Sequence, residues 1–575
     1  MVLLDVKQLN VSFNSHQHRV QAVKDLNFSV HQNRILGIVG ESGSGKTITA
    51  MSILRLLPTN ALLEGSILWS ENEQTSDLCE LEEDRLRAIR GAKISMIFQE
   101  PMSSLNPVLT CGYQVGEGMQ AHRLYPKSEI KDRVLYWLEK VGLPDPSRVY
   151  NSYPHQLSGG QLQRVLIAIA LSCNPKLIIA DEPTTALDVG IQKHIIEMLL
   201  RLKQDLGLSM LFISHDLGVI REICDDVLVM KNGRKIEQGP VNEIFKNPQQ
   251  QYTKGLLYCR PPLQKKLRRL PTMDEFERGT GINHFDDTQC ILPSDLDRKL
   301  VSMHSTAPLI SVKDLNVYYP KKKSWWQKSK KDIPTVKNFN LDIFPGEVIG
   351  LVGESGSGKS TTGKAILQLL EHCTGNVAYL GKNLSQTDRE HMRTLRKDLQ
   401  IIFQDPYSSL NPRLTVGDAI VEPMTVHGIG KNKNERINLA KELLTEVGLL
   451  PEQFDKYPHQ FSGGQRQRIC IARVLGLKPR FIICDESVSA LDVSVQAQVL
   501  NLLQDLKEKF KLSYLFISHD LSVIHFIADR ILVMKDGEVV EEGKSYEIIK
   551  QAKTDYTRNL LASIPGSNYM QELIQ

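Results

Sequence analysis

The chain has 575 residues, of which 41% are hydrophobic and 24% are charged, and its formal net charge is only +4. These values are ordinary for a globular protein, and the length predicts two or more domains. They exclude fibrous and wholly disordered proteins, and so small a net charge gives no support to nucleic-acid binding.

The N-terminal residues and the cysteines indicate a cytosolic protein. Met1–Val6 carry no basic leader, so we expect no secretory signal. No apolar run approaches the roughly 18 residues that a membrane helix needs. The nine cysteines are scattered singly without a C-x-x-C pair, and their odd number argues against a complete disulfide framework.

The first chemical motif in chain order is a glycine-rich segment. In segment 34–39 an apolar run follows Arg34 and predicts a buried strand, and Gly40–Thr47 fits G-x-x-x-x-G-K-[ST] before a helical stretch that ends at Pro58. Glycines let the backbone curl so that N–H groups point at phosphate oxygens, and the helix N-terminus adds positive charge. Lys46 should neutralise the outer phosphates, and the Thr47 hydroxyl should bind Mg²⁺. The predicted nucleotide-binding residues are Gly40, Glu41, Ser42, Gly43, Ser44, Gly45, Lys46 and Thr47.

Two acidic residues follow another apolar strand farther along the chain. Residues 177–180 are continuously apolar and end in Asp181 and Glu182. The first acid can hold hydrated Mg²⁺, and the second is placed to orient the attacking water. Acids at strand ends are commonly helix caps, but the glycine loop in the same domain favours the catalytic interpretation. Helical stretches such as 191–206 alternate with these strands, which predicts an α/β fold with a largely parallel sheet.

The second half of the chain repeats the first. Segments 98–107, 153–161 and 211–216 recur 304 or 305 residues later. So long a period indicates two copies of a whole domain. We predict domains over 1–260 and 308–575, joined by a linker over 261–307 that shows no clear amphipathic period. The repeated site residues are Gly353, Glu354, Ser355, Gly356, Ser357, Gly358, Lys359 and Ser360, followed by Asp485 and Glu486.

Two further blocks identify a family resemblance. Leu157-Ser158-Gly159-Gly160-Gln161 and Phe461-Ser462-Gly463-Gly464-Gln465 resemble the signature of the ATP-binding cassette (ABC) ATPases. The resemblance covers about 1–260 and 308–575, with every family motif in order in both copies. It implies two tandem P-loop ABC ATPase domains of α/β class, each a mixed sheet core with a helical subdomain. In that family two cassettes pair head to tail, so that each ATP lies between one glycine loop and the other signature.

The resemblance assigns the remaining residues to two composite sites. The first would combine its glycine loop with Gln99, Asp181, Glu182, His215, Ser462, Gly463, Gly464 and Gln465. The second would combine its loop with Gln404, Asp485, Glu486, His519, Ser158, Gly159, Gly160 and Gln161. The histidines would contact the γ-phosphate, and the glutamines would sense Mg²⁺ and the attacking water. The implied metal ligands are Thr47, Gln99, Asp181, Ser360, Gln404 and Asp485.

The family also stacks adenine on an aromatic residue just after the first strand. Phe13 and Tyr319 occupy this place, although Tyr318 competes with Tyr319 and ordinary packing is the alternative. Asp188 and Asp492 match a loop that crosses between cassettes. Because both copies keep the glutamate, the histidine and the signature, we expect two hydrolytic sites.

Blocks beyond the ATP motifs resemble the peptide, nickel and glutathione importer subfamily. These are Ser-Ser-Leu-Asn-Pro at 103–107 and 408–412, with Tyr-Thr-Lys-Gly-Leu-Leu at 252–257 and Tyr-Thr-Arg-Asn-Leu-Leu at 556–561. The resemblance implies the ATP-hydrolysing motor of a bacterial importer, peripheral on the cytoplasmic face of the inner membrane. Its partners would be two membrane permeases and, through them, an extracytoplasmic binding protein. Dipeptides, oligopeptides, glutathione, peptide antibiotics and nickel stay open as substrates, with peptides favoured.

The alternative function is that of a soluble tandem ABC ATPase acting on ribosomes as a translation factor. That branch usually has a charged helical linker, whereas this linker carries four prolines. Residues 321–331 hold six lysines around two tryptophans. They predict either a solvated surface loop or a foot on anionic lipid.

Overall fold

The computed structural model describes residues 1–14, 19–184, 188–282, 285–319 and 334–565, and the Lys/Trp segment 321–331 lies outside them. The chain divides into two compact units. The first consists of Met1–Leu257 with Met273–Gly281, and the second of Tyr258–Thr272 with Ile282–Gln575. None of the described helices combines the length and hydropathy that a membrane crossing requires.

The first unit contains two sheets. An antiparallel sheet has the order β2-β1-β4-β5, and a six-stranded sheet has the order β10-β9-β3-β8-β7-β6, in which β10 alone runs antiparallel to its neighbour. Strands β3 and β7 are buried along their whole length, as their apolar runs predict. The α/β class is therefore confirmed. The strands are β1 Val2–Asn14, β2 Arg19–His31, β3 Ile35–Val39, β4 Ala61–Glu71, β5 Gln74–Asp77, β6 Ile94–Ile97, β7 Leu177–Asp181, β8 Ser209–Ile213, β9 Asp226–Lys231 and β10 Arg234–Pro240.

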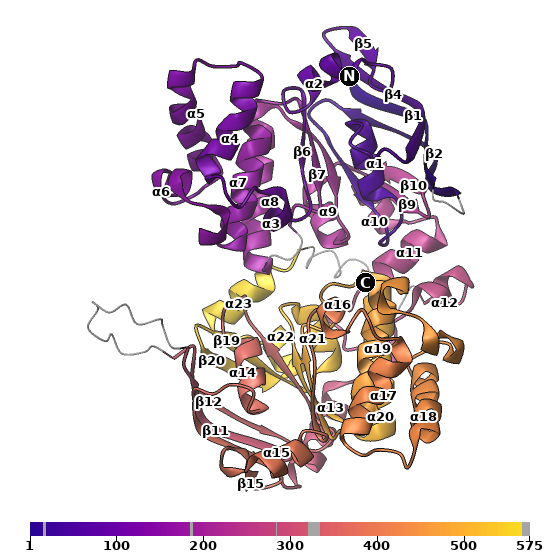
Figure 1. The fold of residues 1–575 in the computed structure, drawn as a ribbon, viewed down its shortest axis with the longest axis vertical. Coiled ribbons are helices and arrows are strands. Elements are labelled where there is room, and N and C mark those ends of the chain that lie inside the picture. The colour runs from indigo at the N-terminus through magenta and orange to yellow at the C-terminus, as the bar shows by residue number, and fades with distance from the viewer. Residues whose placement is uncertain (15–18, 185–187, 283–284, 320–333, 566–575) are drawn as a thin grey trace. The chain divides into compact units, whose positions relative to one another are not determined.

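Helices of the first unit cover the core sheet and form a separate group. Figure 1 shows α4 to α7 gathered beside β6, at one edge of the core sheet, as the expected helical subdomain. Buried Val115, Val134 and Trp137 pack inside that group. The helices are α1 Lys46–Ile53, α2 Glu83–Ile89, α3 Pro101–Ser104, α4 Cys111–Ala121, α5 Lys127–Lys140, α6 Pro146–Asn151, α7 Gly159–Leu171, α8 Val189–Leu206, α9 Leu217–Ile223, α10 Val241–Lys246, α11 Gln251–Tyr258 and α12 Met273–Glu277.

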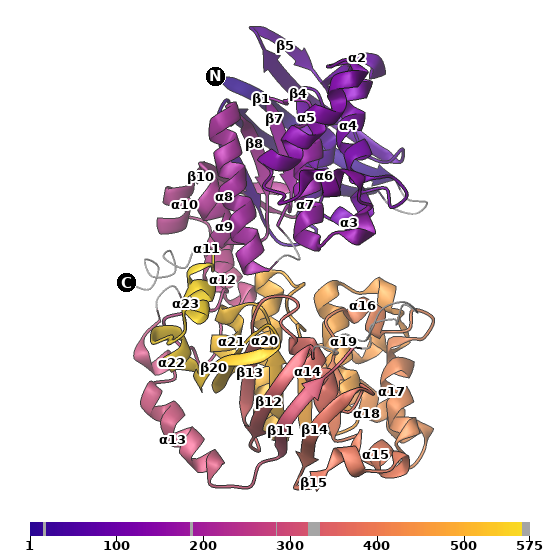
Figure 2. The ribbon, with the colours of Figure 1, turned by 90° about the vertical axis from the view of Figure 1, so that its left-hand side faces the viewer.

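The second unit repeats this plan. Its sheets have the orders β12-β11-β14-β15 and β16-β17-β18-β13-β19-β20, and Figure 2 shows α17 to α19 gathered at one side. Its strands are β11 Ile310–Val317, β12 Val336–Ile343, β13 Val348–Val352, β14 Cys373–Tyr379, β15 Lys382–Asn383, β16 Leu399–Ile402, β17 Phe481–Asp485, β18 Ser513–Ile517, β19 Arg530–Lys535 and β20 Glu538–Lys544. Its helices are α14 Lys359–Ile366, α15 Arg389–Leu395, α16 Pro406–Ser409, α17 Val416–Val426, α18 Lys433–Glu446, α19 Gly463–Leu475, α20 Val493–Phe510, α21 Leu521–Ile527, α22 Ser545–Lys550 and α23 Asp555–Ala562.

The region between the repeats is more ordered than its composition suggests. Helix α13 (Pro293–His304) begins at a proline and buries Leu296 and Leu300, which lie four residues apart on one helical face. Upstream, the buried ammonium of Lys266 donates to three main-chain carbonyls at the end of α21, at 2.5, 2.5 and 3.1 Å. The Asn501 side chain of α20 bonds both the N–H and the carbonyl of Leu270, at 2.9 and 2.8 Å. Part of the linker thus belongs to the core of the second unit.

Candidate active site

The glycine loop of the first unit connects β3 to α1 in a shape that only glycine allows. Gly40 has φ 153°, and a Cβ there would lie 2.2 Å from a carbonyl oxygen of β9. Gly45 has φ 96°, and its Cβ would lie 2.7 Å from a carbonyl oxygen of β2. Lys46 Nζ donates to the carbonyl oxygens of Gly40 and Glu41, at 2.7 and 2.9 Å. The loop and its lysine thus form a compact cradle at the start of a helix, which suits a phosphate group.

The second unit builds the same cradle between β13 and α14. Gly353 has φ 157°, and a Cβ there would lie 2.2 Å from a carbonyl oxygen of β19. Lys359 Nζ donates to the carbonyl oxygens of Gly353 and Glu354, again at 2.7 and 2.9 Å. The two predicted loops therefore have matching geometry.

Two of the three predicted metal ligands, the hydroxyl and the aspartate, meet at the end of each cradle. Thr47 Oγ1 donates to Asp181 Oδ1 at 3.3 Å, and Ser360 Oγ donates to Asp485 Oδ1 at 2.7 Å. Burial raises the pKa of Asp181 to about 6 and raises that of Asp485 as well, although each hydroxyl bond opposes the shift. A bound cation would offset this cost of burying a carboxylate. Hydroxyl and carboxylate oxygens are the hard ligands that Mg²⁺ prefers, so the donor set fits that ion.

A cavity of about 430 Å³ lies at this end of the first site. Its lining brings together Thr47, Asp181 and Gln99, which are more than 50 residues apart from one another in the sequence. Gln99 lies two residues beyond the end of β6, so the ends of two parallel strands and the start of α1 form this wall.

Glu182 occupies a strained position beyond β7. Its φ is 48°, a left-handed conformation that costs free energy in a residue with a Cβ. Its Oε2 accepts a hydrogen bond from Gln99 Nε2 at 3.0 Å and lies 3.1 Å from His215 Nδ1. The strain turns the carboxylate toward the glutamine and the histidine.

The second unit repeats the cluster. Glu486 has φ 46°, accepts from Gln404 Nε2 at 2.8 Å, and lies 3.6 Å from His519 Nδ1. Burial alone would raise the pKa of Glu486, but its interaction with His519 holds that pKa below the ordinary value. Burial would likewise lower the pKa of His519, and Glu486 raises it instead. Both interactions therefore favour the ionised form of the Glu486 carboxylate.

Each signature segment forms the start of a helix. Ser158 caps α7: its Oγ accepts from Gln161 N at 3.4 Å, while Gln161 Oε1 accepts from Ser158 N at 3.1 Å. Ser462 and Gln465 make the same pair of bonds at the start of α19, at 3.3 and 3.1 Å. The signatures are thus rigid helix N-termini, which favour anions.

The candidate adenine-stacking residues differ between the copies. Phe13 lies in β1 and packs partly against the core of its unit, whereas Tyr319 follows β11 and is 51% exposed. Asp188 and Asp492 directly precede α8 and α20. Residues 185–187, which belong to the first of these loops, lie outside the described residues.

Two tyrosines reach the glycine loops without having been predicted as site residues. Tyr252 Oη accepts from Glu41 N, and Tyr556 Oη accepts from Glu354 N, both at 3.2 Å. More than 200 residues separate the partners in each pair, so no local pattern in the sequence could indicate the contact.

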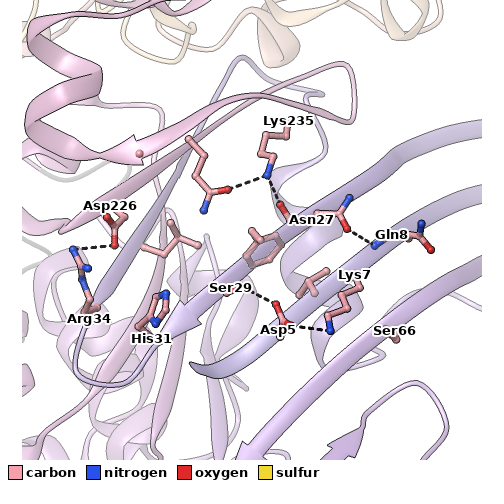
Figure 3. Close-up of a pocket in the computed structure, with 15 residues that line it drawn as sticks. Asp5, Lys7, Gln8, Asn27, Ser29, His31, Arg34, Ser66, Asp226 and Lys235 are labelled. Carbon is pink, nitrogen blue, oxygen red and sulfur yellow. Dashed lines mark hydrogen bonds and ion pairs between the residues drawn. The ribbon is translucent and has the colours of Figure 1, made fainter. Parts of the chain in front are cut away.

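A larger groove of about 760 Å³ lies between β1, β2, β9 and β10 (Figure 3). None of the residues that line it was predicted as a site residue. Across it, Arg34 pairs with Asp226 at 3.1 Å, while the equivalent pair in the second unit is Glu347 with Arg530 at 3.0 Å, with the charges reversed. The two copies therefore share the geometry of the glycine loop and its acidic cluster, whereas the positions of the two charges in this pair are exchanged between them.

The fold and the paired sites define a P-loop ATPase with two nucleotide-binding units in one chain. Residues 23–185 and 336–489 match the family described as "ABC transporter". Residues 236–279 and 540–574 match the family described as "Oligopeptide/dipeptide transporter, C-terminal region". The chain thus belongs to the ABC transporter family, as an ATPase with two cassettes and an oligopeptide-type C-terminal region after each.

Similar proteins come from several enteric bacteria. The chain is 43% identical over 566 residues to proteins called "Glutathione import ATP-binding protein GsiA" from Escherichia coli (strain K12) and Shigella sonnei (strain Ss046). These alignments cover 98% of this chain and 89% of each relative.

Solved structures of single cassettes are also similar. Dimeric MJ0796, described as a bacterial ABC transporter cassette, is 30% identical, with a TM-score of 0.37, 42% of this chain covered and 99% of that chain. The cbiO1 protein from Clostridium perfringens, part of the ABC transporter complex cbiONQ, is 24% identical, with a TM-score of 0.39, 46% of this chain covered and 100% of that chain.

Proposed function

We propose that this chain is the ATP-hydrolysing motor subunit of a bacterial ABC importer whose favoured substrates are peptides. Both C-terminal regions match the oligopeptide/dipeptide transporter family. The GsiA relatives are named for the import of glutathione, which is itself a tripeptide. These two findings support a peptide-type substrate over nickel.

One observation carries the hydrolytic proposal: each cassette holds a strained glutamate against a glutamine and a histidine. An ionised Glu182 or Glu486 can accept a proton from the water that attacks the γ-phosphate. The adjacent glutamine amide orients that water, and the histidine holds the carboxylate and reaches the phosphate. Bound Mg²⁺ would be held by Thr47 and Asp181, or by Ser360 and Asp485, and would supply charge neutralisation on the phosphates.

We infer that each ATP is enclosed by residues of both cassettes. The glycine loop of one cassette supplies backbone N–H groups and a lysine, and the signature helix of the other supplies a second helix N-terminus. ATP would then hold the cassettes together, and hydrolysis would release them. The presence of every required side chain in both copies supports two hydrolytic sites.

The partners would be two integral-membrane permeases and, through them, an extracytoplasmic binding protein. The chain would lie peripherally on the cytoplasmic face of the inner membrane, with its cassette movements transmitted to the permeases.

A pull-down tests this assignment directly. Tagged protein is recovered from detergent-solubilised membranes of its native cell, and the co-purifying proteins are identified by mass spectrometry. Two polytopic permeases would support the importer motor, and addition of candidate peptides with the matching binding protein should then stimulate ATP hydrolysis. Ribosomal proteins without a permease would instead favour a translation factor.

A further inference from the structure

Each glycine loop is held by a tyrosine from the C-terminal region of its own cassette. Tyr252 lies in α11, within the matched segment 236–279, and is only 5% exposed. Its hydroxyl accepts the backbone N–H of Glu41 at 3.2 Å and donates to the Glu41 carboxylate at 3.3 Å. The ammonium of Lys231 lies 4.9 Å from the centre of its ring. These contacts fix the hydroxyl against the start of the loop.

The second cassette repeats the contact although fewer residues separate its loop glutamate from its tyrosine. Tyr556 of α23 lies within the matched segment 540–574, and its hydroxyl accepts the N–H of Glu354 at 3.2 Å. Lys535 lies 5.1 Å from the centre of its ring. The two tyrosines are 304 residues apart, whereas the two loop glutamates are 313 apart. The fold therefore keeps the contact where the length of intervening chain differs.

The geometry suggests what this hydrogen bond does. The peptide unit that links Gly40 to Glu41 is held at both sides: its carbonyl accepts from Lys46 Nζ at 2.7 Å, and its N–H donates to Tyr252. The corresponding unit in the second cassette is held between Lys359, at 2.7 Å, and Tyr556. Because a peptide unit is planar and turns as one body, fixing the N–H also fixes the carbonyl that positions the lysine.

We propose that Tyr252 and Tyr556 are positioning residues for ATP binding, which pre-form the phosphate cradle by holding the first peptide unit of each glycine loop. This proposal rests on the proposed ATP sites. It adds one tyrosine to each site, and both tyrosines lie outside residues 23–185 and 336–489, which match the ABC transporter family. It assigns the oligopeptide-type C-terminal region a part in nucleotide affinity, because α11 and α23 carry the two hydroxyls.

The test is the removal of one oxygen atom at a time. Tyr252→Phe, Tyr556→Phe and the double variant keep the ring and its lysine neighbour but lose the hydroxyl. Tyr546→Phe is the matched control, because Tyr546 lies in the same C-terminal region and its hydroxyl bonds Asp297 at 3.1 Å, away from the glycine loop. Equilibrium binding of a fluorescent ATP analogue, steady-state kcat and KM, and the thermal midpoint are measured for the full-length chain.

We expect the double variant to raise Kd and KM by about two- to tenfold, the factor that one hydrogen bond supplies, with kcat changed much less. Each single variant should weaken one of two binding phases, and Tyr546→Phe should leave Kd unchanged. A double variant with wild-type Kd and KM would overturn the proposal, as would a lower thermal midpoint with wild-type Kd, which would indicate a structural role only. If the double variant fails to fold, the single variants decide the question at one site each. A wild-type chain that neither binds nor hydrolyses ATP would instead refute the proposed function.

Discussion

Protonation of one buried histidine should make the second unit sensitive to mild acid. His525 lies in α21, is 2% exposed, and its Nδ1 has no hydrogen-bond partner in the described part of the chain. Burial, with the positive charges of Lys266 and Lys550, lowers the pKa of His525 to about 3, against a weaker opposing bond to the Ser545 backbone. The folded state therefore holds this imidazole neutral.

The sign and size of the effect follow from linkage. In the unfolded chain the histidine has its ordinary pKa of about 6.5, so below that pH the unfolded state binds more protons than the folded state. The contribution of neutral His525 to the free energy of unfolding is fully present above pH 6.5. It is lost as the pH falls from 6.5 toward the folded-state pKa of about 3. Between pH 7 and pH 5 the loss of unfolding free energy is about 2 kcal/mol.

The variant His525→Gln should remove this dependence. Unfolding of the second unit is followed by pulse proteolysis in urea at pH 7, 6 and 5, with the surviving fragment quantified by mass spectrometry. The decrease in the free energy of unfolding between pH 7 and pH 5 should be about 2 kcal/mol smaller in the variant than in the wild type. His372→Gln, at an exposed position in the same unit, is the control and should leave the drop unchanged. Parallel pH curves for the wild type and His525→Gln would refute the reasoning.

The remaining predictions concern the catalytic cluster, the loop and the linker. Glu182→Gln and Glu486→Gln should each lower phosphate release by at least about tenfold, because each removes a general base and leaves one ATP unhydrolysed, which keeps the cassettes together and stalls the other site; wild-type turnover in either would show that the sites are not equivalent. Gly40→Ala should abolish ATP-analogue binding at the first site and leave one of the two binding phases, since its Cβ would lie 2.2 Å from a backbone carbonyl, and a variant that keeps both phases would show that the loop can relax. Asn501→Leu should cost about 1–3 kcal/mol of stability and speed proteolysis within 258–272, because it leaves linker backbone groups unpaired; an unchanged cleavage rate would contradict this.

The parts of the site that lie in continuous segments could be predicted from the sequence. A glycine loop needs a strand, glycines and a helix within about 20 residues, and all of these are visible in the chain around Gly40 and Gly353. The acids at the ends of β7 and β17 could be found for the same reason. The long sequence repeat indicates the duplication, and the alternation of apolar strands with helical stretches predicts the α/β organisation.

Features that depend on distant residues or on backbone strain could not be predicted in this way. The left-handed conformation of Glu182 and Glu486 is imposed by the surrounding fold, since the side chain itself disfavours it. The hydroxyl of Tyr252 reaches a loop residue 211 positions away. Helix α13 is not predicted by the sequence because only two buried apolar side chains, Leu296 and Leu300, mark its inner face within a charged segment.

The path of the chain through the two units has a practical consequence for separating them. After Leu257 the chain contributes residues 258–272 to the second unit, returns to the first for Met273–Gly281, and then leaves it for good. A single cut before Met273 would leave that segment on the wrong fragment, and a cut after Gly281 would carry 258–272 away from Lys266's partners in α21. No single break in the linker yields two complete units, because the linker supplies residues to both. Two separately expressed cassettes would therefore each need their own copy of residues 258–281.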